Sequence, residues 1–578
     1  MQNMEPLEDV SAVSEGEEAS ATRMPEEPSD TERAGAVTIG GSAVEAGPGL
    51  AGVLDRAVPI LVLVALLLHP TQIGATRWLV LLAEAVGLDG LFQAAVATQA
   101  DGSAVSLRSV LLAVNMTVSD VLLLLAFVGW TASAWRERRL RHLPRFYPAG
   151  VVVLLAAALL SALPFLKPSG IMTGRTFSPG SAFKQCFQLF LFFVASLGVM
   201  ADYLSRRAWK GRLMAAVLVA GAVCVALGLV EYAQLRPAGP GARDQGALLS
   251  VMQVDGTFGF RAQAAGAHEQ VGTASSRNML GAWLTLVLPL AWATFLFGRR
   301  AWVRGVSLAL TAGGALLLLH GALWAIAVLA MLCLAWVRGR AAFAATAAGL
   351  FVLFSLAFML GPQQHGYILL DSLMPSKRSD RFRELPLYEI DPPLDRSSGV
   401  ADLTQPGYST WQQKYVEWQP ALQALGRNPL FGVGAGNYQA NINAFYEGQP
   451  ADSAHNPARC YLIEKPRKNL MEVDGNPFYR VWMVETGLAG LLAFACLLMS
   501  ALGHGRRTLP ATEAGASMDR ALKLGAIAAL ASACAGMLFV NYWVRGVGIA
   551  YALVLALCVA EPVEREKFMP ASEEVTQV

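Results

Sequence analysis

Apolar runs recur along nearly the whole of this 578-residue chain, and many of them are long enough to cross a lipid bilayer. A helix needs roughly 20 predominantly apolar residues to span the hydrocarbon core of a membrane. Charged residues make up 15% of the chain, whereas a soluble protein usually carries about 25%. We therefore predict an all-α polytopic membrane protein, and we exclude a soluble enzyme, a coiled coil and a secreted disulfide scaffold.

The apolar runs predict about twelve membrane spans. They lie near residues 57–73, 108–132, 148–165, 184–203, 213–232, 277–297, 305–319, 321–337, 342–360, 477–503, 521–541 and 545–560. If the N-terminus is cytoplasmic, the cytoplasmic loops are all basic: 136–145, 205–212, 298–304, 338–340 and 504–520. Because cytoplasmic loops are enriched in Lys and Arg, both termini are predicted to lie in the cytoplasm.

The chain divides into five parts by composition. Residues 1–45 carry eleven acidic residues against Arg23 and Arg33, a net charge of −9. Such a segment buries too little apolar surface to fold by itself. The predicted parts are a disordered acidic cytoplasmic tail (1–52), nine membrane helices with an outer loop at 233–276 (53–360), a large periplasmic loop domain (361–476), three membrane helices (477–560) and a cytoplasmic tail (561–578).

The outer insert at 361–476 is far longer than the ~12–15 residues of an ordinary structureless connection, and long loops often carry function. Within it, apolar side chains recur at the spacing of one helix face: Trp411, Tyr415, Trp418, Leu422 and Leu425. We predict a helix there, which Pro420 interrupts and Asn428–Pro429 ends.

Nucleotide and metal motifs are absent from the sequence, which contains no Walker A sequence, no H-E-x-x-H and no C-x-x-C pair. ATP-driven transport by this chain and a zinc site are therefore not expected. Gly432-Val433-Gly434-Ala435-Gly436 is rich in glycine, but it lacks the strand-to-helix context of a nucleotide site. We favour a tight turn in which these glycines adopt positive φ.

Several short motifs follow one another in a specific order. The insert carries Asn428-Pro429-Leu430-Phe431-Gly432-Val433-Gly434-Ala435-Gly436-Asn437, and the helix after it carries Glu485-Thr486-Gly487-Leu488-Ala489-Gly490. Upstream, Gly256-Thr257-Phe258 precedes Asn278 and Leu288-Pro289-Leu290. Over roughly residues 210–500, this order resembles that of the O-antigen ligase and O-antigen polymerase superfamily.

The resemblance implies a membrane glycosyltransferase of GT-C-like fold that uses an undecaprenyl-diphosphate-linked glycan at the outer face of the bacterial inner membrane. Polymerases pass the glycan to another carrier-linked repeat, and ligases pass it to the lipid A core. We lean to a polymerase of a surface polysaccharide. No metal or nucleotide cofactor is implied, because diphosphate is already a good leaving group. The implied partners are membrane lipid and other assembly proteins, such as a flippase and a chain-length regulator, and no nucleic acid.

The implied site needs cations for the diphosphate and a base for the acceptor hydroxyl. Lys414 and His320 stand where the family has arginine, and the histidine expected just before the Glu485 helix is missing. We expect His455 to act as the base, with Glu485 as the next choice. The residues expected to bind the diphosphate are Lys414, Arg480, His320, Arg261 and Arg277.

Other interpretations stay open. Each of these side chains also has a structural explanation as a solvated charge or, for Arg480 and Glu485, as an ion pair. The chain is alternatively a ligase, a transporter or carrier-lipid flippase, or an inactive scaffold of the family. Transporters usually carry inverted repeats and charges near the midplane, whereas the polar residues here are concentrated on the outer side.

Overall fold

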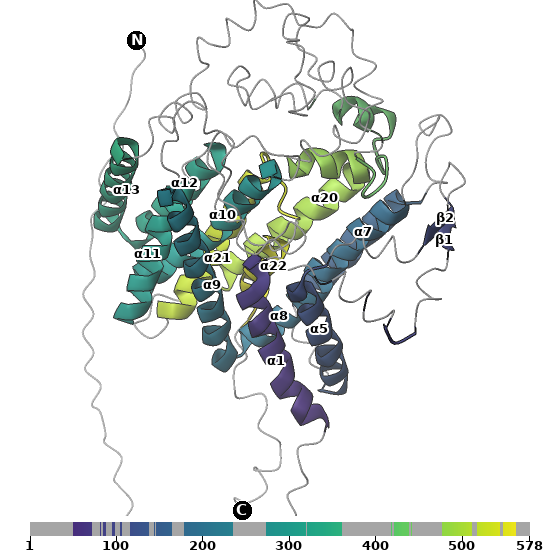
Figure 1. The fold of residues 1–578 in the computed structure, drawn as a ribbon, viewed down its shortest axis with the longest axis horizontal. Coiled ribbons are helices and arrows are strands. Elements are labelled where there is room, and N and C mark those ends of the chain that lie inside the picture. The colour runs from purple at the N-terminus through teal and green to yellow at the C-terminus, as the bar shows by residue number, and fades with distance from the viewer. Residues whose placement is uncertain are drawn as a thin grey trace, which may run out of the picture. The chain divides into compact units, whose positions relative to one another are not determined.

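The computed structural model is mostly helical (Figure 1). All of the described helices belong to one unit that begins at Leu50. The structure describes residues 50–71, 75, 81, 85–87, 95–98, 104–106, 116–137, 144, 146–163, 179–234, 273–318, 321–360, 418, 421–438, 441, 477–510, 517–543 and 547–561.

Helices follow one another along the chain. They are α1 (Leu50–Leu68), η1 (His69–Thr71), α5 (Val118–Glu137), α6 (Phe146–Ser161), α7 (Pro179–Leu189), η4 (Phe190–Ser196), α8 (Leu197–Ser205), α9 (Arg207–Gln234), α10 (Thr273–Phe297), α11 (Ala301–Leu317), α12 (Gly321–Arg338), α13 (Arg340–Leu360), α20 (Phe478–Arg507), α21 (Ser517–Gly536) and α22 (Val547–Val559). Each of the twelve predicted apolar segments overlaps at least one of these helices.

Three helical segments are long and apolar enough to cross a membrane: Ala182–Ser205, Trp209–Ala226 and Phe478–Arg507. Shorter apolar helices of 10–17 residues accompany them in the described part of the chain. The mostly helical architecture is therefore confirmed, and the apolar helices support an association with membrane. The total of twelve spans stays a prediction.

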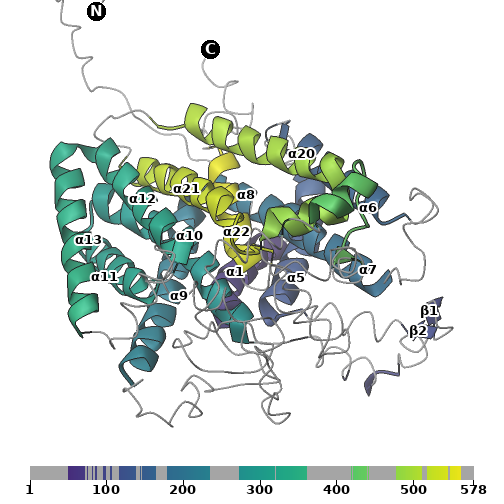
Figure 2. The same ribbon diagram turned by 90° about the horizontal axis from the view of Figure 1, so that it is seen from above.

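A two-stranded antiparallel sheet interrupts the helical architecture, and the sequence analysis did not predict it. Strand β1 (Ala95–Thr98) pairs with β2 (Ala104–Ser106), with Ala97 opposite Val105 and an irregularity between Ala95 and Ala97. In both views the sheet lies on the side of the bundle away from α13 (Figures 1 and 2). The segment lies between two long apolar runs and contains no such run itself, so helical periodicity gave no signal there.

Helix α22 lies at the centre of the bundle (Figures 1 and 2), and every residue of it is buried. Its sequence is apolar on all sides, as expected for a helix that other helices surround. Gly548 allows one of these neighbours to come close, because a Cβ at this position would lie 2.3 Å from the Phe192 ring. The bundle is therefore built around a helix with no solvent-facing side.

The π-helical turn η4 continues α7 into α8 and carries part of the core. The Tyr147 hydroxyl, on α6, donates a hydrogen bond to the Phe193 carbonyl of this turn. The Phe193 ring lies edge-on to Phe494, Trp543 and Tyr551, with centroids 6.4, 5.4 and 6.2 Å away. The irregular turn is thus fixed by a hydrogen bond and by aromatic packing.

The helix predicted over 521–541 ends earlier than expected. Helix α21 stops at Gly536, and residues 537–543 turn back into the core without regular structure. Tyr542 and Trp543 are buried, and the Tyr542 hydroxyl donates to Thr285 Oγ1 over 2.6 Å, since Thr285 itself donates to the Ala282 carbonyl. Burying these aromatic side chains favours the turn over a longer helix, and irregular backbone is tolerated among apolar helices where protein encloses it.

We expect Gly548→Ala to lower the melting temperature of the purified protein. The added methyl group would overlap the Phe192 ring, and overpacking a closed core costs about 1–3 kcal/mol. Gly349→Ala in α13 is the matched control, because a Cβ there meets nothing within 4 Å. Scanning fluorimetry in detergent should show the control melting at or above the wild-type temperature. Equal melting temperatures for the two variants would contradict this packing of α22.

Candidate functional site

Helix α20 contains a break. At Gly487 the backbone has φ 66° and ψ −163°, although the chain is helical on both sides. Glycine is suited to this conformation, and a side chain here would also meet its neighbour, because a Cβ would lie 2.4 Å from the Leu430 carbonyl. A break frees backbone N–H and C=O groups of the flanking turns, which then need partners elsewhere.

Residues 428–438, here called the glycine segment, supply those partners. The segment follows a helical stretch at 421–427, so the predicted helix end at Asn428 is confirmed. Its three glycines have φ values of 61°, 109° and 72°, which confirms the predicted turn: Gly432, Gly434 and Gly436. The Asn428 side-chain amide closes the turn by donating to the Gly432 carbonyl over 2.6 Å.

Four backbone hydrogen bonds join the glycine segment to the break in α20. Two run toward carbonyls of α20 and two come from its amides: Val433 N to Val484 O (2.7 Å), Gly434 N to Glu485 O (2.8 Å), Leu488 N to Pro429 O (2.8 Å) and Ala489 N to Leu430 O (3.2 Å). The approach is close, because a Cβ at Gly432 would lie 2.2 Å from the Val484 carbonyl oxygen. The segment therefore replaces the hydrogen bonds that the helix loses at Gly487.

Two of the predicted site residues meet around Tyr438, at the end of the glycine segment. Arg480 and Glu485 lie on α20 with only 1% and 4% of their surface exposed. Glu485 Oε1 accepts a hydrogen bond from the Tyr438 backbone N–H over 3.2 Å. The Arg480 guanidinium lies 5.7 Å from the centroid of the Tyr438 ring. A buried carboxylate and a buried guanidinium are thus held at the same residue, where removal of either would be costly.

The glycine segment is also tied to α6. The Ala435 N–H donates to Ser161 Oγ over 3.1 Å, and that hydroxyl donates to the Ala158 carbonyl over 2.7 Å. Within the segment, the Asn437 side-chain amide donates to the Ala435 carbonyl over 3.0 Å. The segment also shares a small apolar cluster with the preceding helical stretch and with α20: Ala421, Ala424, Val433, Tyr438, Met483 and Val484. The segment thus bridges two helices.

The other predicted site residues are not placed by the structure. Arg277 lies in α10, but its side chain is outside what the structure describes. His320, Lys414, His455 and Arg261 lie outside the described residues altogether. The two long loops predicted on the outer side, 361–476 and 233–276, are described only at 418, 421–438 and 441, at the last two residues of α9 and at the first residues of α10.

Tyr438 and Ser161 were not among the predicted site residues. Tyr438 accepts no role that a motif would mark: it bonds Glu485 through its backbone N–H, which every residue except proline has, and its ring lies near Arg480 only in the folded chain. Ser161 lies at the end of an apolar helix and was indistinguishable from a capping residue. Among the described residues, no group of three or more His, Cys, Asp or Glu side chains is placed to hold a metal ion.

No protein-family model matches this chain, and no curated protein sequence matches it significantly.

Gly487→Ala and Gly432→Ala should each loosen the contact between the glycine segment and α20. Both added methyl groups would overlap backbone atoms of the facing segment, and local strain of this kind costs of order 1–3 kcal/mol. In hydrogen–deuterium exchange, peptides that cover 428–438 and 484–490 should then exchange about tenfold faster.

Gly426→Ala is the control for this experiment, because a Cβ at that helical residue meets nothing within 4 Å. It should leave exchange at both segments unchanged. If Gly487→Ala exchanged as slowly as Gly426→Ala, the four hydrogen bonds would not depend on the break.

Proposed function

We propose that this chain is a bacterial inner-membrane glycosyltransferase that polymerises undecaprenyl-diphosphate-linked glycan repeats of a surface polysaccharide. One observation carries the proposal. Two of the motifs on which the family resemblance rests, the glycine segment and the E-T-G turn at Glu485–Gly487, are bonded directly to each other. Their joint occurrence therefore has a physical reason, and it supports a shared architecture with polysaccharide ligases and polymerases.

The proposed topology has twelve spans, cytoplasmic termini and the insert at 361–476 on the periplasmic side. It is supported by the basic loops and by the apolar helices. In this topology the break in α20 lies near the outer end of that helix, because Gly487 is close to its first residue, Phe478. The glycine segment would then join the outer insert to the membrane part.

The proposed reaction needs one base and several cations. His455 removes the proton from the acceptor hydroxyl, the oxygen attacks the anomeric carbon, and the diphosphate leaves with the bonding electron pair. Its charge is stabilised by the cations of the outer side: Lys414, Arg480, His320, Arg261 and Arg277. Lysine acts on phosphate as a point charge, whereas arginine offers a forked pair of donors.

Glu485 is assigned a positioning role. Its carboxyl group is buried and accepts the Tyr438 N–H, so this hydrogen bond holds the end of the glycine segment against α20. A buried carboxylate with a fixed donor is suited to orientation, and His455 is better suited to proton transfer near pH 7. Glu485 is the next residue to test as the base.

A transporter is the second candidate, because a broken helix is typical of transport sites. In transporters the freed helix ends face the substrate or ion. Here the backbone groups at Val484, Glu485, Leu488 and Ala489 are bonded by the glycine segment instead. This difference favours the transferase.

Deleting the gene and separating the surface glycan on a gel tests the proposed function. We expect the ladder of chain lengths to collapse to a single repeat, because polymerisation would stop while repeat synthesis continues. Full-length carrier-linked chains that never reach the lipid A core would indicate a ligase. An unchanged glycan together with lost uptake of a solute would contradict the transferase and favour the transporter.

Site variants separate the proposed roles when glycan assembly is restored from a plasmid. His455→Ala should abolish polymerisation, and Lys414→Ala should weaken it, with membrane expression unchanged in both. Glu485→Gln keeps an oxygen acceptor for the Tyr438 N–H and should retain most activity, whereas Glu485→Ala should lose it. If His455→Ala were fully active and Glu485→Gln were inactive, the base would be Glu485 and not His455.

A further inference from the structure

A basic surface lies at one end of the bundle, where α10 ends, α11 begins and α12 turns into α13. We call it the basic end surface. Its members are exposed: Arg299, Arg300, Trp302, Arg304, Trp336, Arg338 and Arg340. The two tryptophans expose 64% and 59% of their surface, although this residue type is usually well buried. Arginine and exposed tryptophan thus occur side by side.

The two basic turns of this surface are distant in sequence and close in space. The Arg338 guanidinium, at the end of α12, lies 5.4 Å from the centroid of the Phe297 ring, at the end of α10. Arg304 reaches back over the same turn, 5.4 Å from the Phe295 ring, and its Nε donates to the Phe295 carbonyl over 3.1 Å. Only Gly339 separates α12 from α13, so Arg340 directly follows. Both turns therefore present their charge together.

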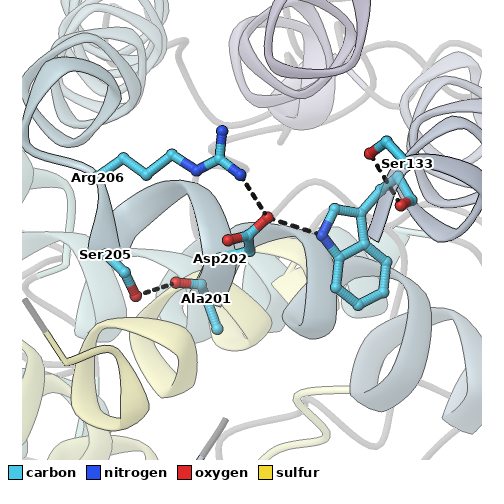
Figure 3. A network of polar contacts seen from close by, with 6 residues as sticks. Ser133, Ala201, Asp202, Ser205 and Arg206 are labelled. Carbon is cyan, nitrogen blue, oxygen red and sulfur yellow. Dashed lines mark hydrogen bonds and ion pairs between the residues drawn. The ribbon is translucent and has the colours of Figure 1, made fainter. Parts of the chain in front are cut away.

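This positive charge is not balanced by its own segment, because residues 273–360 contain no Asp or Glu. Three carboxylates with described side chains lie beside basic side chains outside this surface: Asp202 beside Arg206 (3.1 Å), Asp519 beside Lys210 (2.8 Å) and Glu561 beside His504 (3.2 Å). Figure 3 shows the first of these, in which the same Asp202 oxygen also accepts the Trp130 indole N–H. A negatively charged partner from outside the bundle would balance the surface.

The helices next to this surface expose apolar side chains along their length. Figures 1 and 2 show α11, α12 and α13 along one side of the bundle. Their exposed apolar residues are Val306, Leu308, Leu329, Val337, Phe351, Val352 and Leu356. An apolar wall that ends in tryptophan and arginine is the pattern of a protein at the boundary between acyl chains and headgroups.

We propose that the basic end surface binds the headgroups of anionic phospholipids. The guanidinium groups would meet phosphate oxygens with forked donors, and the tryptophans would lie at the level of the headgroups. The proposal rests on the membrane insertion proposed above, and it is independent of glycosyl transfer. Anionic lipid would thereby hold the α10–α13 side of the bundle at a fixed depth.

Native mass spectrometry of the purified protein tests this, with phosphatidylglycerol and phosphatidylcholine of matched acyl chains as probes. The wild-type protein should retain phosphatidylglycerol in preference to phosphatidylcholine. Each basic residue near an anionic surface contributes about fivefold in affinity, so Arg338→Gln/Arg340→Gln should bind phosphatidylglycerol about 25-fold more weakly. Arg299→Gln/Arg300→Gln, from the other turn, should show a similar loss. Unchanged melting temperatures would show that both variants are folded.

Arg506→Gln/Arg507→Gln, at the end of α20, is the control with the same change in charge. It should keep more of the wild-type preference than either of the other variants, because no exposed tryptophan accompanies these arginines on α20. An equal loss in this control would overturn the proposal, since it would reflect net charge alone. Displacement of phosphatidylglycerol by millimolar inorganic phosphate, or no preference between the two lipids, would overturn it as well.

Discussion

At Gly487 the backbone of α20 leaves the helical conformation within an apolar bundle, and its freed amide and carbonyl groups need partners there. Unsatisfied backbone groups are costly in such surroundings. The glycine segment meets this need with four hydrogen bonds, and it can approach because Gly432 has no side chain. This contact fixes the position of Tyr438. It also brings the Ala435 N–H to Ser161 Oγ and covers the Glu485 side chain.

The sequence predicted the positions of the helices well, because long apolar runs form helices wherever water is excluded. Each of the twelve predicted segments overlaps a helix. The sequence did not predict features that depend on contacts between residues distant in the chain. Helix α21 ends at Gly536 because Tyr542 and Trp543 are buried against other helices, and η4 depends on Tyr147 from another helix. The sheet formed by β1 and β2 gave no signal because its strands are very short.

For the candidate site, the sequence indicated single residues and the structure indicates how two of them are joined. Arg480 and Glu485 were marked by their charge at the start of an apolar helix, which is an unusual place for charge. Their common partner could not be marked, because Tyr438 takes part through its backbone N–H and its ring. The positive φ of the glycines was predictable from residue type, but the docking partner, Val484–Ala489, was not.

Three carboxylates of the described bundle share an arrangement that bears on the chemistry. Asp120 accepts the N–H of the turn before α5, Asp202 accepts the Trp130 indole N–H, and Glu485 accepts the N–H of Tyr438. In all three cases a fixed N–H donor meets a carboxylate in largely apolar surroundings. Asp202 and Glu485 join segments that are distant in sequence, whereas Asp120 closes the turn at the start of α5. The hydrogen bond from Tyr438 N–H to Glu485 thus gives Glu485 a structural role like that of the other two carboxylates. The proton transfer of the proposed reaction is therefore better assigned to a side chain elsewhere in the insert at 361–476, whose glycine segment is bonded to α20.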